Sequence, residues 1–296
     1  MTLVVDLGQS GSRIRTGDTS INSTRGKLAG EHPLPALRAI FESTEKLSAT
    51  TVALSCTGFG GVVTDPKPFL DLCKEFFGAS KVAVIDDGLA GFVGALGGSN
   101  GVVLSIGGGV VSVGGNNSHF AHRDGLGSTF GDEGGGYWLG KLGLTRALGV
   151  RQGRGDDQIL LDAFADSVLA YDALDVKNAT DAATLAITSA KNLLAAADAG
   201  SPTAISIRNE GAYLLAQTVT ATWFGAGGLA DDSPEIAIQG GPSRNPAYVN
   251  AIQSNIAKVI SKTNFVQARG DNLDGAQWIA ENMHGDAKPL LAWAGN

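Results

Sequence analysis

Two short apolar segments joined by a glycine-rich turn open the sequence and constrain its fold more than any other stretch. An apolar segment ends at Asp6, the turn at residues 8–12 follows, and polar and apolar side chains then alternate. This order predicts a β-hairpin. The same order returns as apolar segment 101–106, glycine turn 107–109 and apolar segment 110–114. Two halves that open in the same way indicate a duplicated fold.

The first turn carries groups that suit a phosphate, because it exposes backbone N–H groups and hydroxyls. Its residues are Gly8, Gln9, Ser10, Gly11 and Ser12. A carboxylate at the end of a buried strand is costly without a partner. Asp6, beside this turn, is placed to hold the Mg²⁺ that accompanies a nucleotide phosphate. A plain hairpin with an acid at its mouth is the alternative, and the hairpin alone leaves both open.

Beyond the first hairpin the pattern alternates between strands and helices, which predicts an α/β fold with parallel pairing. Strands are expected at 51–56, 81–85, 235–239 and 264–268, and helices at 33–47, 66–77, 89–96, 156–171, 182–199, 202–224 and 247–261. The polar residues 19–30 are expected to form a loop. A chain of 296 residues suits two domains of roughly 100–200 residues each.

Composition narrows the function classes. The net charge of −7 argues against a nucleic-acid or anionic-membrane surface. No apolar run reaches the roughly 18 residues of a membrane span, and a strand that begins at residue 3 leaves no room for a signal peptide. Cys56 and Cys73 stand outside any Cys/His cluster, so free thiols are expected. Together these features predict a cytoplasmic protein.

Two adjacent acids, Asp132 and Glu133, lie in a glycine-dense loop directly before a helix that opens with Tyr137 and Trp138. Acids near a helix N-terminus are explained by capping alone. The number of glycines exceeds what a cap needs, and close backbone approach to a ligand explains it. Both interpretations remain open on the residues.

Several motifs resemble the BadF/BadG-type ATPases of the actin, sugar kinase and heat-shock ATPase superfamily, and in detail the N-acetylglucosamine kinases of that family. The most specific is Gly-Asp-Glu-Gly-x-Gly-Tyr-Trp-Leu-Gly at 131–140, and the others lie at 6–13, 84–90, 240–241 and 273–276. The resemblance implies two ribonuclease-H-like, actin-like ATPase domains with mixed sheets flanked by helices and a cleft between the domains. The expected domains are 1–98 with a C-terminal helix at about 282–296, and 99–281.

The resemblance also implies an ATP-dependent amino-sugar kinase that phosphorylates the 6-hydroxyl of N-acetylglucosamine with Mg²⁺. Asp87 matches the family's catalytic aspartate and would act as general base, with Asp86 as its rival. ATP would be held by the first turn and by Gly107, Gly108, Gly109, Gly240, Gly241 and Ser243, whereas Asp132 and Glu133 would bind sugar hydroxyls. Sugar kinases of this kind are often homodimers.

One departure keeps alternatives open. The family's second phosphate loop usually reads Ala-Gly-Thr-Gly-Ser, whereas residues 106–110 read Ile-Gly-Gly-Gly-Val and lack both hydroxyls. A glucosamine kinase is one alternative. Another is a BadF-type ATPase without sugar transfer, although that class needs cysteines for an iron–sulfur cluster. A sugar-sensing binder without catalysis is a third.

Overall fold

The computed structural model describes residues 1–8, 11–17, 19–28, 31–117, 119–173, 178–283 and 289–295. The chain divides into two compact units. The first consists of Met1–Val103, Val113–His122 and Gln267–Asn296, and the second of Leu104–Ser112 and Arg123–Val266. Within the described ranges, none of the helices has the length and apolar character needed to cross a membrane.

The first unit is built on a six-stranded sheet with the order β11-β5-β4-β1-β2-β3. Its strands are β1 (Thr2–Leu7), β2 (Ser12–Thr16), β3 (Thr19–Ser23), β4 (Thr51–Cys56), β5 (Lys81–Asp86) and β11 (Leu291–Gly295). β1, β4 and β5 are parallel, and β2, β3 and β11 each run antiparallel to a neighbour. The register pairs Asp6 with Arg13 on β2 and with Ser55 on β4. Directly opposed residues share a face, so these polar side chains meet.

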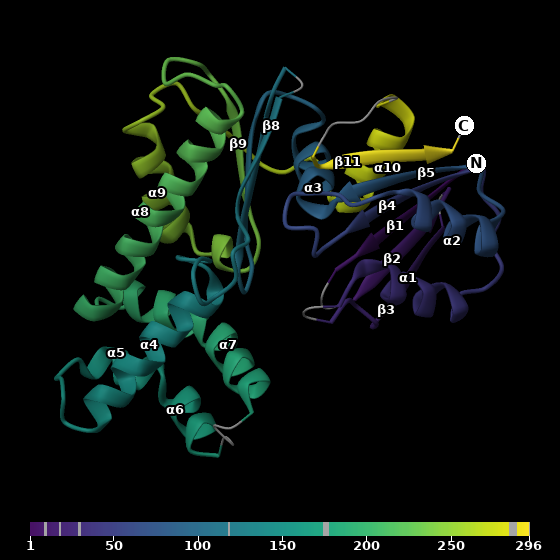
Figure 1. Ribbon diagram of the computed structural model, residues 1–296. Helices are drawn as coiled ribbons and strands as arrows, with labels where there is room; N and C mark the ends of the chain where they lie inside the picture. Colours follow the sequence, from purple (N-terminus) through teal and green to yellow (C-terminus); the bar gives the residue numbers. More distant parts are fainter. Residues whose placement is uncertain are drawn as a thin grey trace. The chain divides into compact units, whose positions relative to one another are not determined.

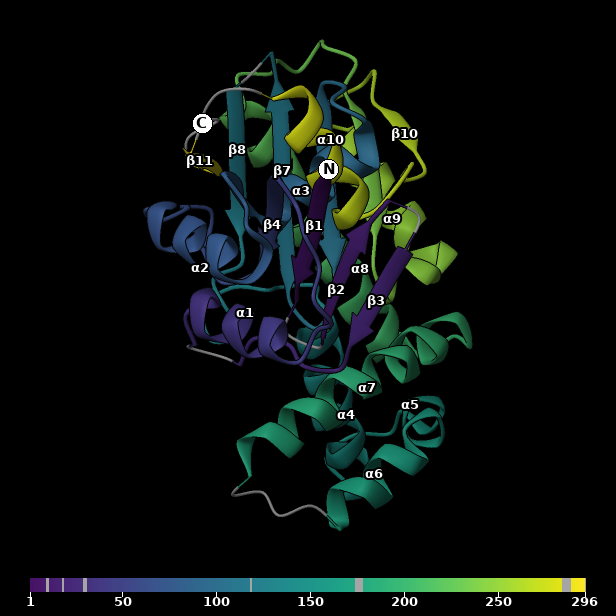
Figure 2. The ribbon, with the colours of Figure 1, turned by 90° about the vertical axis from the view of Figure 1, so that its right-hand side faces the viewer.

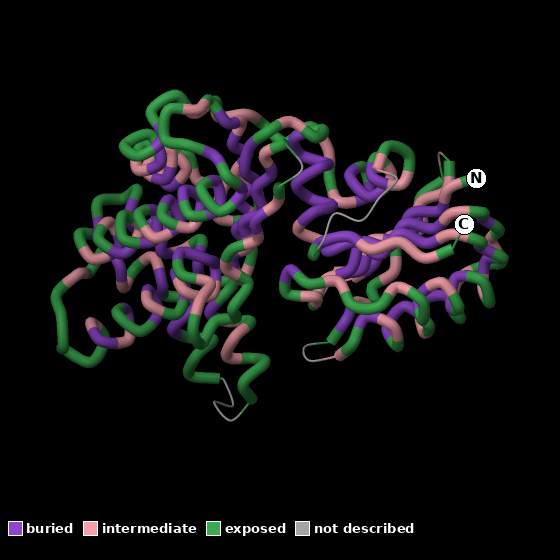
Figure 3. Tube along the Cα trace, turned by 45° about the horizontal axis from the view of Figure 1, so that its top comes forward, coloured by how far each residue is buried: buried purple, intermediate pink, exposed green. Residues whose placement is uncertain are grey.

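Two helices cover each face of this sheet: α1 (Pro33–Glu42) and α2 (Lys67–Phe77) on one, α3 (Asp87–Leu96) and α10 (Asn272–Asn282) on the other (Figure 1). Because strand side chains alternate, Leu3, Val5 and Leu7 join the core beneath α1 and α2. α3 and α10 approach closely, since a Cβ on Gly275 would lie 1.8 Å from the Ala90 carbonyl oxygen. The three parallel strands β1, β4 and β5 are accordingly buried along most of their length (Figure 3).

A second sheet has the order β10-β9-β6-β7-β8. Its strands are β6 (Gly101–Ile106), β7 (Val110–Asn116), β8 (His119–Asp124), β9 (Glu235–Gln239) and β10 (Asn264–Val266). β6, β7 and β8 take the places that β1, β2 and β3 have in the first sheet, and β9 and β10 take those of β4 and β5. The predicted α/β class with two sheets flanked by helices is therefore confirmed.

The second unit adds a large helical part. Its helices are α4 (Gly136–Arg151), α5 (Gln158–Ala163), α6 (Ala165–Asp172), α7 (Ala179–Asp198), α8 (Pro202–Gly225), the 3₁₀ helix η1 (Pro242–Arg244) and α9 (Pro246–Ala257). Figure 2 shows α4, α5, α6 and α7 gathered together. α4 packs along α7 through small residues, because a Cβ on Gly140 would lie 1.8 Å from the Ala186 carbonyl oxygen.

Two expected elements are wrong. In place of a C-terminal helix at about 282–296, residues Leu291–Gly295 form β11, which completes the edge of the sheet beside β5; residues 284–288 and 296 lie outside the described residues. The expected loop at 19–30 contains β3, a mostly exposed and polar edge strand. β3 forms although its residues are polar, because it pairs with the adjacent strand β2, and the apolar β11 forms a strand because it pairs with the distant β5.

Candidate functional site

Asp6 lies at the end of β1 and is held from three sides. Arg13 Nη2 is 2.8 Å from its Oδ2, while Ser55 Oγ and Asn272 Nδ2 donate to Oδ1 at 3.1 and 3.3 Å. The side chain is 13% exposed. Among the residues that the structure describes, no three His, Cys, Asp or Glu side chains cluster to hold a metal ion. A metal ion near Asp6 would therefore draw its other ligands from water or a bound molecule.

The first glycine turn is closed by its backbone. The Gly8 N–H donates to the Gly11 carbonyl at 2.9 Å, and the Lys27 N–H donates to the Gly8 carbonyl at 2.9 Å. Ser12 Oγ is buried and has no hydrogen-bond partner among the residues that the structure describes. Gln9 and Ser10, also predicted to bind phosphate, lie outside the described residues. The turn thus retains a hydroxyl that none of the described residues engages in a hydrogen bond.

Asp86, at the end of β5, accepts hydrogen bonds from backbone N–H groups with both carboxylate oxygens. It is 1% exposed. Its Oδ1 accepts from the Gly88 N–H at 3.0 Å, which caps α3, and its Oδ2 accepts from the Gly61 N–H at 3.1 Å. Burial raises the pKa of this carboxyl, and the backbone donors partly offset that rise. With both oxygens occupied, Asp86 fastens the 58–61 segment to α3.

Asp87, the next residue, begins α3 and is partly exposed. Burial raises the pKa of its carboxyl to about 6, the charge of Asp86 adds to the rise, and a hydrogen bond from Thr57 opposes it. A carboxylate with a pKa close to neutral pH can take up a proton during a reaction and release it afterwards. Of the two adjacent acids, Asp87 is the more exposed.

The second glycine turn is held by the start of α4. The N–H groups of Gly136 and Tyr137 donate to the carbonyls of Gly107 and Gly108, each at 2.8 Å, and the Gly107 N–H donates to the Gly109 carbonyl at 2.8 Å. Within the described chain, the N–H groups of Gly108 and Gly109 donate no backbone hydrogen bond. Fixed carbonyls and free N–H groups are the arrangement of an anion-binding turn.

The two acids of the Gly-Asp-Glu-Gly motif lie in different places. Asp132 Oδ1 accepts from the Val110 N–H at 3.0 Å, so the carboxylate lies against the second glycine turn, and burial raises its pKa. Glu133 is exposed and lines a separate cavity of about 740 Å³ together with Trp138 and Glu210. The structure therefore places Asp132, and not Glu133, beside the turn.

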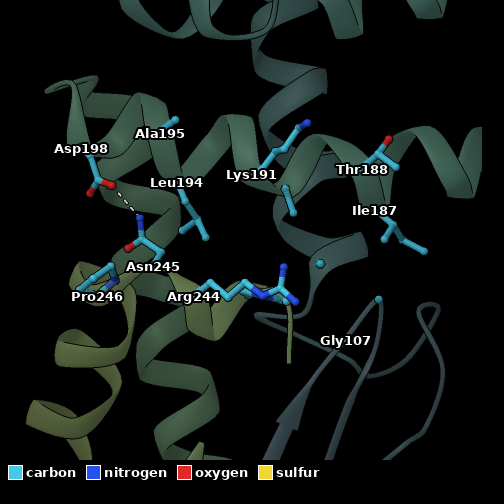
Figure 4. Close-up of a pocket in the computed structure, with 15 residues that line it drawn as sticks. Gly107, Ile187, Thr188, Lys191, Leu194, Ala195, Asp198, Arg244, Asn245 and Pro246 are labelled. Atoms are coloured by element: carbon cyan, nitrogen blue, oxygen red, sulfur yellow. Dashed lines mark hydrogen bonds between the residues drawn. The ribbon is translucent and has the colours of Figure 1, made fainter. Parts of the chain in front are cut away.

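A pocket of about 590 Å³ lies in the second unit, next to the second glycine turn (Figure 4). Three of the residues predicted to hold a nucleotide, Gly107, Gly108 and Gly241, line it. Gly109, Gly240 and Ser243 are not among its lining residues. Ser243 Oγ instead donates to the Gly240 carbonyl at 2.8 Å and shapes the turn after β9.

One wall of this pocket escaped the sequence analysis. It is formed by α7, through Ile187, Lys191 and Asp198, and by η1 and the start of α9, through Arg244 and Asn245. Asn245 Nδ2 donates to Asp198 Oδ2 at 2.6 Å and joins the two parts of this wall. A signal existed in the sequence, because Lys191 is the only basic residue of α7 and shares a helical face with Ile187 and Asp198.

Solved structures share this architecture. A candidate N-acetylglucosamine kinase from Chromobacterium violaceum matches with a TM-score of 0.65 at 20% identity, over 93% of this chain and 96% of that one. Another from Porphyromonas gingivalis matches with a TM-score of 0.62 at 15% identity, over 95% and 99%. A ROK family glucokinase from Streptomyces griseus, in complex with glucose and AMPPNP, matches with a TM-score of 0.56 at 16% identity, over 95% and 99%. At these identities the likeness shows a common fold.

Sequence comparison gives the family directly. No curated protein matches the chain by sequence. The profile of the BadF/BadG/BcrA/BcrD ATPase family, however, matches residues 2–277, which is almost the whole chain. This protein therefore belongs to the BadF/BadG/BcrA/BcrD ATPase family.

Proposed function

We propose that this protein is an ATP-dependent sugar kinase that phosphorylates the 6-hydroxyl of N-acetylglucosamine. The observation that carries the proposal is Asp87, a partly exposed carboxylate with a pKa of about 6 at the edge of the first sheet. Asp6 lies at the same end of this sheet, because its strand β1 runs parallel to β4, and β4 runs parallel to β5. Two similar structures are candidate N-acetylglucosamine kinases, which favours this sugar.

ATP would bind in the pocket of the second unit. A volume of about 590 Å³ is in the range of small-molecule pockets. The free N–H groups of Gly108 and Gly109 suit phosphate oxygens, and Gly241 lines the pocket where adenosine is expected. Arg244 adds a positive charge to the same pocket. Without the hydroxyls of the turn, the site consists of backbone donors, this guanidinium and the Lys191 ammonium.

In the proposed reaction Asp87 accepts the proton of the sugar 6-hydroxyl. The hydroxyl oxygen forms a bond to the γ-phosphorus, while the bond from that phosphorus to the β,γ-bridging oxygen breaks and its electron pair leaves with ADP. Mg²⁺, when bound, would neutralise charge on the phosphates. Asp6, held in place by Arg13, would orient the water shell of that ion.

Membership of this ATPase family also allows a second function, an ATPase that drives electron transfer. That class uses cysteines to hold a cluster at a surface between two subunits. Cys56 and Cys73 are both fully buried in the core of the first unit, and burial raises the pKa of each thiol. Neither thiol is placed at a surface, so the kinase is the better-supported function.

The proposal is tested by following ADP release from Mg²⁺·ATP with N-acetylglucosamine, glucosamine, glucose, N-acetylmannosamine or no sugar. Strong stimulation by N-acetylglucosamine, with N-acetylglucosamine 6-phosphate as product, is the expected result. Stimulation by glucosamine alone would move the assignment to a glucosamine kinase. ATP turnover that does not depend on any of the sugars would contradict the kinase assignment and favour the ATPase.

A further inference from the structure

Lys27 lies in the segment that follows β3 and is 5% exposed, which is unusual for a lysine. Its ammonium donates to the Leu28 carbonyl at 3.1 Å. The ion pairs of the described residues do not include Lys27. A buried ammonium is costly without an anionic partner. One acceptor also leaves two of its three N–H donors for another group.

The place of Lys27 in the fold connects it to the candidate site. Its backbone N–H binds the Gly8 carbonyl, two residues after Asp6. Its side chain lies over Gly58, where an added Cβ would stand 2.1 Å from Lys27 Cε and 2.7 Å from Nζ. Gly58 follows Thr57, whose hydroxyl binds Asp87. The ammonium therefore lies at the ends of β1 and β4, between the strand that carries Asp6 and the segment whose Thr57 binds Asp87.

Gly58 also shows that the Lys27 side chain packs in a defined position. Its φ of 94° lies in the left-handed region, which favours glycine, and the missing side chain leaves the space that Lys27 fills. An apolar residue of similar length would fill the same space without the cost of burying a charge. A charge kept at such a position points to a function that requires it.

We propose that the Lys27 ammonium binds an anionic oxygen group of the ligand at this edge of the first sheet. The inference rests on the proposed function for the identity of that ligand. One source is the phosphoryl group in transfer, where a cation lowers the energy of the charged transition state. The other is an acidic substituent on the sugar. Both present oxygens to the two unused N–H donors.

The experiment compares the wild type with Lys27→Met, which keeps the length and removes the charge, and Lys27→Arg, which keeps the charge. Calorimetric titrations use inorganic phosphate, N-acetylglucosamine, its 6-phosphate, and its 3-O-carboxymethyl ether. We expect Lys27→Met to weaken at least one anionic probe about tenfold or more, as for a lost charged hydrogen bond, and to leave N-acetylglucosamine within about twofold. Loss confined to the 6-phosphate and inorganic phosphate assigns the phosphoryl group, and loss confined to the carboxymethyl ether assigns an acidic sugar.

Unchanged binding of all four probes by Lys27→Met would overturn the inference. Equal loss of the neutral sugar and the anions would also overturn it, because that result indicates a structural role. If Lys27→Met does not fold, Lys27→Gln and Lys27→Arg decide the matter, with Arg expected to bind anions more tightly than Gln. Inorganic phosphate needs no turnover, so a wild type without sugar-dependent ADP release would refute the kinase and still test Lys27.

Discussion

The two strand–turn–strand hairpins of this protein occupy the same place in two sheets of the same order, yet they carry different chemistry. In the first, β1 ends in a carboxylate, Asp6, bound by Arg13, Ser55 and Asn272. At the matching position of β6 stands Ser105, which accepts a hydrogen bond from Gln239 Nε2 at 3.0 Å. One strand end is charged and the other is neutral.

The turns differ in the same way. The first keeps a hydroxyl at Ser12, whereas the second consists of Gly107, Gly108 and Gly109 and is held by the N–H groups of α4. A duplicated backbone thus gives two specialised sites. We infer that the charged copy serves metal and proton chemistry and that the neutral copy binds phosphate through its backbone. The predictions below test that division.

Replacing the proposed base should have the largest effect. We expect Asp87→Asn to lower kcat by about 10²–10⁴-fold, the usual contribution of a general base, while the affinity for ATP stays close to that of the wild type. Coupled ADP release and nucleotide titration measure the two quantities. Asp71→Asn, an exposed change on α2, is the control. Full activity of Asp87→Asn would contradict the assignment of Asp87, in the sheet of the first hairpin, as the general base.

The same residue sets a pH dependence. Because the pKa of Asp87 is raised to about 6, the folded protein binds this proton more tightly than the unfolded chain. Its contribution to stability is therefore present at pH below about 4 and lost as the pH rises through 6. At pH 7.5 we expect Asp87→Asn to be more stable than the wild type by on the order of 2 kcal/mol, with the gap closing toward pH 4. Chemical denaturation at both pH values measures it, and a gap independent of pH would contradict the shifted pKa.

Asp6→Ser turns the charged strand end into a copy of the neutral one. We expect kcat to fall by about 100-fold, because the orientation of the metal's water shell is lost, and the dependence on Mg²⁺ concentration to weaken. Stability should fall by only about 1 kcal/mol, since the partly exposed Arg13 keeps its pairing with Asp271. Turnover across a Mg²⁺ series and thermal unfolding give both numbers.

Ser105→Ala is the matched control for that change. It removes the acceptor of Gln239 at the equivalent position, so stability should fall by about 1 kcal/mol while the Mg²⁺ dependence stays unchanged. An equal loss of turnover in Asp6→Ser and Ser105→Ala would contradict the division between the two hairpins.

The sequence predicted the fold class and most of the helices, because apolar periodicity and capping are local signals. The pair Asp86 and Asp87 was also visible, at the end of an apolar strand. Local pattern could not tell their roles apart. That distinction depends on the Gly61 N–H, which comes from a segment 25 residues away and occupies Asp86. The sequence therefore identified two candidate acids at the end of a strand, and tertiary contacts distinguish between them.

The same limit explains the pocket and the sheet edges. α7 was predicted as a helix, but its face with Ile187 and Lys191 becomes the wall of a pocket only because the glycine turn and η1 lie beside it. β3 carries a weak apolar signal and β11 is apolar but short, and both form strands because they pair with the edges of β2 and β5. The last two predictions concern this pocket, which the sequence only partly described.

Arg244 is the cation that extends along the pocket toward the Gly107 end in Figure 4. We expect Arg244→Ala to raise the KM for ATP about tenfold, as for loss of a charged hydrogen bond, and to leave the KM for the sugar unchanged. Lys258→Ala, an exposed change at the end of α9, is the control. A rise in the KM for the sugar alone would place Arg244 outside the nucleotide site.

The smallest expected effect comes from restoring the family's hydroxyl to the neutral turn. A Cβ on Gly108 would lie 2.9 Å from Ile187 Cδ1, the end of a flexible side chain, so Ile187→Ala should make room. In that background we expect Gly108→Thr to lower the KM for ATP about threefold, because one net hydrogen bond to phosphate is gained. Gly108→Val has the same shape without the hydroxyl and should bring no gain. If Val and Thr lower the KM equally, filling the pocket is the cause, and the turn binds phosphate without needing the hydroxyl that its family usually carries.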